Sequence, residues 1–89
     1  MPEPSHPYEE RVRATLAEHA RLPVDVQTLQ AYDDLFQAGM TSHASVNVML
    51  ALEEAFEVEF PPEMLTKSTF RSVSNIAGAL RRLGVGLAQ

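Results

Sequence analysis

The stretch GMTSHASVNVMLALEEAF, residues 39–56, contains the strongest structural signal in this 89-residue sequence. Gly39 permits a sharp turn, and either Thr41 or Ser42 is a suitable N-cap for the helix that follows. Apolar side chains then recur at helical spacing from Ala44 to Phe56, residues 58–60 lead out of the helix, and Pro61-Pro62 prevents any continuation. The residues that mark the helical spacing are Val46, Met49, Leu50, Glu53 and Phe56. The apolar side of the helix is widened by Val48, Ala51, Leu52 and Ala55. We expect this helix to be the main contributor to the core.

Two further main helices are predicted, one near each end of the chain. The first begins near Ser5 and ends between His19 and Arg21, before Pro23. The last begins after Ser72 as N-cap and ends at Gly84. Their apolar faces consist of Tyr8, Val12 and Leu16 in the first helix, and of Val73, Ile76, Ala77 and Leu80 in the last.

Residues 22–40 form a long first loop rich in turn-forming residues. Because so long a loop without structure is unusual in a compact domain, we expect apolar side chains such as Leu35 to hold it against the core, with part of it helical. Pro62 can open a short helix that runs through Leu65. No segment alternates with a period of two residues. The predicted fold is therefore all-α: a small four-helix bundle with three main helices and one short helix.

The length and composition indicate one domain over residues 1–89, with residues 1–5 frayed and 84–89 flexible. The chain has no Cys, and its three His show no metal-ligand spacing, so we expect no disulfide and no metal site. Neither a signal peptide nor an apolar run of about 20 residues is evident. We therefore expect a cytoplasmic protein that does not enter a membrane.

Acidic side chains are concentrated in the middle of the chain. Residues 22–66 contain eight of the twelve carboxylates and no Lys or Arg, whereas all seven bases lie outside this range. Such a distribution opposes nucleic-acid binding, because phosphates would be repelled. It favours a basic protein partner, although a solvated acidic face that keeps the protein soluble explains it equally well.

Ser42 is the candidate functional residue. Because the core-facing spacing is expected to begin at Val46, the Ser42 side chain should be exposed at the first turn of the helix. The unpaired N–H groups and positive dipole of a helix N-terminus favour a phosphate there. On these residues alone, an N-cap role worth about 1 kcal/mol is the simpler interpretation. A catalytic pair with His43 is disfavoured, because adjacent helical residues do not face each other and no orienting acid is evident.

The stretch DDLFQAGMTSHASVNVMLALEEAFEVEFPPEML (33–65), followed by TFRSVSNIAGAL (69–80), resembles the acyl carrier protein family. That family has Asp-x-x-Phe, Gly-x-Asp-Ser-Leu, Val-Glu-Leu, a pair of Glu, a Phe and a late Thr-Phe-x-x-Val in this order. The resemblance implies that a phosphopantetheinyl transferase attaches phosphopantetheine to Ser42. It further implies that the arm holds an acyl or aminoacyl group as a thioester for a downstream acceptor enzyme, and that the chain itself is not an enzyme.

Three positions beside Ser42 depart from the family pattern. Thr41 replaces the usual Asp, His43 the usual Leu and Asn47 the usual Glu. These changes indicate a specialised carrier with its own partner. The run GMTSHASV is similar to bacterial carriers that receive an amino acid from a ligase related to class II aminoacyl-tRNA synthetases. The resemblance places partner contacts at Met40, Thr41, His43, Val46, Asn47, Glu53, Glu54 and Glu57.

The alternative function is an interaction module. Such a chain would have the same fold but no phosphopantetheine, and would act as an acidic docking or regulatory subunit. The altered residues around Ser42 support this alternative, whereas the ordered set of family motifs supports a carrier.

Overall fold

The computed structural model describes residues 7–84, and all regular structure in this range is helical. The three main helices are α1 (Pro7–His19), α3 (Ser42–Phe56) and α4 (Val73–Arg82). The connections contain the short α2 (Leu35–Ala38) and the 3-10 helices η1 (Val26–Thr28) and η2 (Pro62–Met64). The all-α prediction is confirmed. The fourth α-helix is α2, inside the long first loop, whereas the short helix expected at Pro62 is the 3-10 turn η2.

The predicted helix ends agree with the structure wherever local chemistry determines them. Ser72 caps α4 by accepting a hydrogen bond from Asn75 N–H, and Gly84 follows its last turn with a φ of +77°. The expected start at Ser5 lies outside the described residues, as do residues 1–5 and 85–89 of the predicted flexible ends. Within residues 7–84, no helix is long and apolar enough to cross a membrane.

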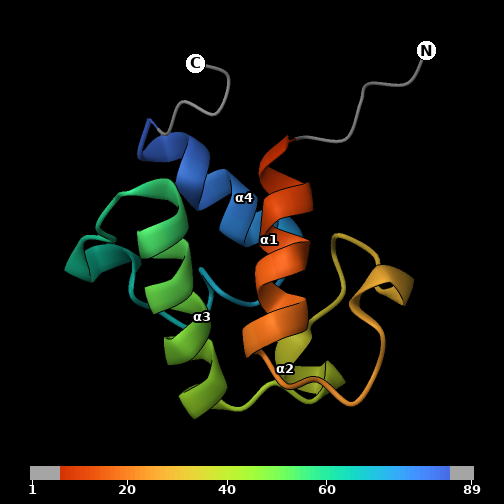
Figure 1. Cartoon of the computed structure of the whole chain (residues 1–89). Helices are drawn as coiled ribbons and strands as arrows, with labels where there is room; N and C mark the ends of the chain where they lie inside the picture. Colours follow the sequence, from red (N-terminus) through yellow and green to blue (C-terminus); the bar gives the residue numbers. More distant parts are fainter. Residues whose placement is uncertain (1–6, 85–89) are drawn as a thin grey trace.

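α1 packs against both α3 and α4, as Figure 1 shows. α1 and α3 run in opposite directions, so the first turn of α3 lies at the same end of the molecule as α2 and the last turn of α1 (Figure 1). Within residues 7–84, eight side chains have no exposed surface: Val12, Leu16, Leu35, Val48, Leu52, Val73, Ile76 and Leu80. They come from all four α-helices, so one core joins the ends of the chain to the middle.

Hydrogen bonds attach the long first loop to its surroundings. The Arg13 guanidinium on α1 donates to the carbonyl oxygens of Val26 and Leu29, at 2.9 and 2.8 Å. At the other end of the loop, Leu35 N–H donates to the Arg71 carbonyl. These bonds hold η1 against α1 and the start of α2 beside the segment that precedes α4.

The buried face of α3 differs from the predicted one. The buried row is Ala44, Val48, Leu52 and Phe56, whereas Val46 and Leu50 are 49% and 53% exposed. The expectation that the core-facing row begins at Val46 is therefore wrong. The buried residues follow one another at a spacing of four, which places them in a single row on the helix surface. Two large apolar side chains remain on the opposite side, beginning one turn after Ser42.

Candidate functional site

A tight turn positions the first residue of α3. Gly39 ends α2 with a φ of +123°, and a Cβ at this position would come within 2.6 Å of the Pro23 side chain. A residue other than glycine would therefore be both strained and crowded here. Met40 follows, with its N–H bonded to the Leu35 carbonyl and its side chain only 3% exposed. The turn is thus anchored in the core directly before Thr41.

Thr41, and not Ser42, caps α3. The Thr41 hydroxyl oxygen accepts a hydrogen bond from Ala44 N–H at 3.0 Å, and the Thr41 backbone is extended. Ser42 is consequently the first residue inside the helix, and the interpretation of Ser42 as a capping residue is wrong. Its side chain is exposed, as expected, and its hydroxyl has no hydrogen-bond partner among residues 7–84.

The amide groups at this helix end are also available. In the described part of the chain, neither Ser42 N–H nor His43 N–H has a hydrogen-bond acceptor. Unpaired N–H groups of a first helical turn, together with the positive end of the helix dipole, favour an anionic group nearby. A phosphodiester on the Ser42 oxygen would lie beside these groups.

A groove of about 310 Å³ opens next to Ser42. It lies between the first half of α3 and the segments that contain α2 and residues 65–70, and most of its lining side chains are apolar. The lining residues are Phe36, Ser42, Ser45, Val46, Met49, Leu65, Thr66, Lys67 and Phe70. Among these residues, all from the described part of the chain, Lys67 alone is charged. Sequence reasoning did not single out Lys67, although it is the first base after Arg21.

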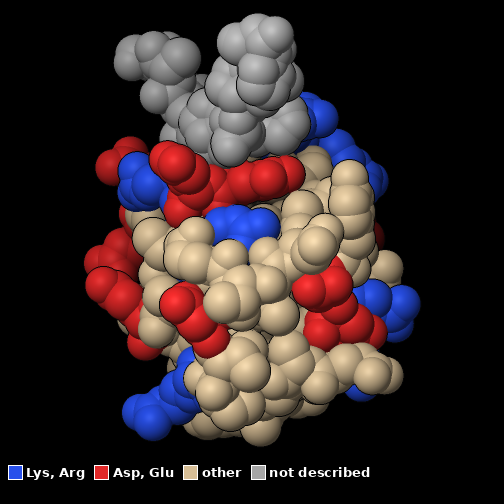
Figure 2. Space-filling model, turned by 90° about the vertical axis from the view of Figure 1, so that its right-hand side faces the viewer, with Lys and Arg blue, Asp and Glu red and all other residues tan. Residues whose placement is uncertain are grey.

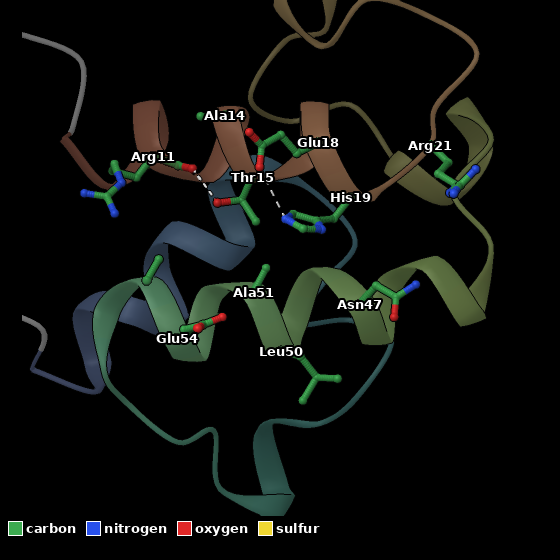
Figure 3. A pocket seen from close by; sticks show the side chains of 11 residues that line it. Arg11, Ala14, Thr15, Glu18, His19, Arg21, Asn47, Leu50, Ala51 and Glu54 are labelled. Carbon is green, nitrogen blue, oxygen red and sulfur yellow. Dashed lines mark hydrogen bonds and ion pairs between the residues drawn. The ribbon is translucent and has the colours of Figure 1, made fainter.

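A second, larger groove of about 630 Å³ lies between α1 and α3 and does not include Ser42. Figure 3 shows Asn47, Leu50 and Glu54 along α3, opposite the Glu18–His19 pair on α1. Small side chains such as Ala51 leave this groove open. Asn47 and Glu54 therefore border a different groove from Ser42 and Val46, although all four belong to the same helix.

The predicted partner residues separate into three groups. Thr41, His43, Val46, Asn47, Glu54 and Glu57 have exposed side chains. Glu53 is half-buried, and its carboxylate accepts a hydrogen bond from Phe60 N–H at 2.9 Å. Met40 lies in the core, so its side chain is not on the surface where we expected a partner contact. Leu50, which was expected in the core, belongs to this exposed surface instead.

The side of the molecule that carries η1 is not uniformly acidic (Figure 2). On the side that carries η1, acidic and basic side chains both occur, interspersed with neutral surface (Figure 2). Folding brings bases from the flanking segments to this region, because Arg71 pairs with Asp34 at 3.7 Å and Arg13 bonds to the loop carbonyls. On this side, folding therefore lessens the charge asymmetry of the sequence.

Residues 10–80 match the family described as "phosphopantetheine attachment site". The chain belongs to this family. Its members carry a covalently attached phosphopantetheine and are carriers that are not themselves catalytic. The resemblance to carrier proteins that the sequence suggested is thus confirmed, together with its cofactor.

Known carriers similar to this one include the aminoacyl carrier protein of Agrobacterium fabrum (strain C58), which is 40% identical over 70 residues. That alignment covers 79% of this chain and 84% of the relative. A chain in the crystal structure of an engineered Bradyrhizobium japonicum glycine:[carrier protein] ligase, complexed with a carrier protein from Agrobacterium tumefaciens and ATP, matches with a TM-score of 0.82. It is 37% identical, and the match covers 84% of this chain and 97% of that one. The corresponding complex with AMP gives a TM-score of 0.80 at 38% identity, over 82% of this chain and 97% of that one.

Proposed function

We propose that Ser42 carries the phosphopantetheine arm and that this chain is an aminoacyl carrier. The observation that supports the attachment site best is that Thr41, and not Ser42, provides the N-cap of α3. Because the Thr41 hydroxyl caps α3, the Ser42 hydroxyl is exposed and without an intramolecular partner, and it can be modified without loss of the cap.

The surroundings of Ser42 fit the proposed group. The free N–H groups of Ser42 and His43 suit a phosphodiester, and the apolar sides of the groove, such as Val46 and Met49, suit the hydrocarbon part of the arm. When bound, the group supplies a thiol that holds the cargo as a thioester. The chain itself contributes position: Gly39 and the buried Met40 direct the start of α3, and Thr41 stabilises its first turn.

Similarity to known carriers and the residues beside Ser42 support an aminoacyl cargo. The 40% identical relative is named an aminoacyl carrier protein, and the matched structures contain a glycine:[carrier protein] ligase. Fatty-acid carriers have acidic side chains at the positions of Thr41 and Asn47 and an apolar side chain at the position of His43, and this chain lacks all three. We therefore propose that a ligase of the amino-acid-loading type is the partner that charges this carrier.

The exposed side of α3 is the surface that we assign to this partner. It contains His43, Val46, Asn47 and Leu50, followed by Glu54 one turn later. Val46 and Leu50 are large apolar residues that are about half exposed, and apolar groups in the centre of a contact surface contribute most to binding. A partner for this surface should therefore present an apolar patch near the entrance to its active site.

The attachment can be tested by intact mass spectrometry. We expect the wild-type protein to gain the mass of one phosphopantetheine when it is incubated with coenzyme A and a permissive phosphopantetheinyl transferase. Ser42→Ala should gain none, whereas Ser45→Ala, which removes the next hydroxyl on the same helix, should gain the full mass. A wild-type protein that stays unmodified, or a Ser42→Ala variant that is modified, would contradict the proposal. The unmodified outcome would favour the interaction module.

The cargo can be tested on the modified protein. Incubation with ATP, single amino acids and a carrier-protein ligase should add one aminoacyl group, which hydroxylamine should release because it is held as a thioester. Loading should depend on Ser42. Failure with every amino acid, together with loading of a fatty acyl group by an acyl-carrier ligase, would refute the aminoacyl assignment and leave the attachment site intact.

A further inference from the structure

Lys67 lies in the groove that begins at Ser42. Nine of the described residues line this groove, and Lys67 is the only charged one among them. A single cation in a largely apolar groove, next to a serine that carries an anionic group, is an arrangement of complementary charge. Lys67 belongs to a different segment from the N-terminus of α3.

The position of the Lys67 ammonium is constrained, yet it is not neutralised. It lies over the Phe36 ring, 4.9 Å from the ring centroid, and Phe36 lines the same groove. No carboxylate lies within 4.0 Å of it in the described part of the chain, because the nearby Asp34 pairs with Arg71 and caps α2. The aromatic face keeps the lysine side chain beside the groove and leaves its charge available to a ligand.

We propose that Lys67 is a positioning residue that binds the phosphodiester of the arm on Ser42. This inference rests on the proposed attachment site and extends it. The ammonium attracts the phosphodiester from the groove side, whereas the N–H groups of Ser42 and His43 face it from the helix side. The first part of the arm then lies against Val46 and Met49 instead of extending into solvent.

The contact between Lys67 and the phosphodiester would form and break readily. Lys67 is exposed and lysine is strongly hydrated, so its attraction for one phosphodiester is modest and is screened by salt. A partner enzyme can therefore draw the arm out of the groove without having to break a buried ion pair. Lys67 thereby favours the orientation in which the arm lies along the groove, while the arm remains available to partner enzymes.

The test compares the modified and unmodified forms of four proteins by NMR. These are the wild type, Lys67→Gln, Lys67→Arg and Arg82→Gln, the last of which removes one exposed positive charge at the end of α4. The measured quantities are the changes in the methyl resonances of Val46 and Met49 on modification, and the ³¹P line width. In Lys67→Gln, we expect the docked population of the arm to fall about two- to fivefold, as for the loss of one exposed ion pair. Lys67→Arg and Arg82→Gln should retain the wild-type values.

The outcomes separate this inference from the attachment site. If mass spectrometry shows no phosphopantetheine on Ser42, both proposals fail. If Ser42 is modified but Lys67→Gln leaves the methyl and ³¹P signals unchanged, only the role of Lys67 is refuted. An equal effect of Arg82→Gln would show that net charge, and not the position of Lys67, determines the result, and would also overturn the inference.

Discussion

Thr41 and Ser42 are adjacent and both exposed, yet their hydroxyl groups differ in hydrogen bonding. Thr41 directs its hydroxyl toward the backbone of α3, whereas the Ser42 hydroxyl faces outward. The acyl carrier pattern that the sequence resembles has an aspartate in place of Thr41, and a carboxylate caps a helix equally well while adding a negative charge. Thr41 therefore preserves the cap without that charge, which leaves the surroundings of Ser42 less acidic.

Substitutions at Thr41 and Ser42 test whether Thr41 alone stabilises the start of α3. Thr41→Ala should lower the free energy of unfolding by about 1 kcal/mol, because Ala44 N–H loses its acceptor, and Thr41→Asp should retain most of the stability. Ser42→Ala should change it by less than about 0.5 kcal/mol, as expected for an exposed residue without a structural contact. Urea denaturation followed by circular dichroism measures all three. A Ser42→Ala cost equal to that of Thr41→Ala would show that Ser42 also stabilises the helix start.

At the scale of the elements, Glu53 closes the far end of α3. Its carbonyl accepts hydrogen bonds from Glu57 N–H and Val58 N–H, and its carboxylate accepts one from Phe60 N–H. Glu57 has a left-handed backbone, with a φ of +56°, which turns the chain out of the helix. Glu53 thus joins α3 to the segment that leads to η2, in addition to any contact with a partner.

Adjacent glutamates allow a matched test of this role. Glu53→Ala should destabilise the protein by about 1–3 kcal/mol, because the partly buried Phe60 N–H would lose its acceptor. Glu54→Ala, which removes an exposed carboxylate one residue later, should alter stability by less than about 0.5 kcal/mol. Thermal denaturation of both variants provides the measurement. Equal stability of the two would show that the Glu53 hydrogen bond contributes nothing.

The elements also show what the sequence could predict. The ends of α4 and the turn at Pro62 follow from capping and backbone restrictions that act within a few residues, so they were predictable. The buried face of α3 was not, because apolar side chains occur on most sides of this helix and periodicity alone does not select among them. The groove beside Ser42 could not be predicted either, since it unites Phe36, Ser42 and Lys67 from three separate segments. The family motifs pointed to Ser42, but they carried no information on Lys67.

At the scale of the whole molecule, a small core supports a site at one end of the bundle. A chain of this size buries only about 60% of the surface that its unfolded form exposes. Its total stability is therefore expected to be roughly 4–13 kcal/mol, from about 0.05–0.15 kcal/mol per residue. α1 contacts both α3 and α4, so loss of packing between α1 and α3 would loosen the bundle and the groove beside Ser42 together. The position of Ser42 therefore depends on the stability of the whole domain.

Two leucines on α3 provide the test at this scale. Leu52 is fully buried and Leu50 is 53% exposed, so the same substitution probes the core and the surface of one helix. Leu52→Ala should lower the free energy of unfolding by about 2–5 kcal/mol, through lost burial and a cavity, and should lower the melting temperature by roughly 10 °C or more. Leu50→Ala should cost less than about 1 kcal/mol, because much of its side chain is already in water, but it should weaken binding to the loading ligase. Chemical denaturation and a binding titration with the modified carrier separate these effects. Equal destabilisation by the two substitutions would mean that α3 does not present Leu50 to solvent, and the surface assigned to the partner would then be wrong.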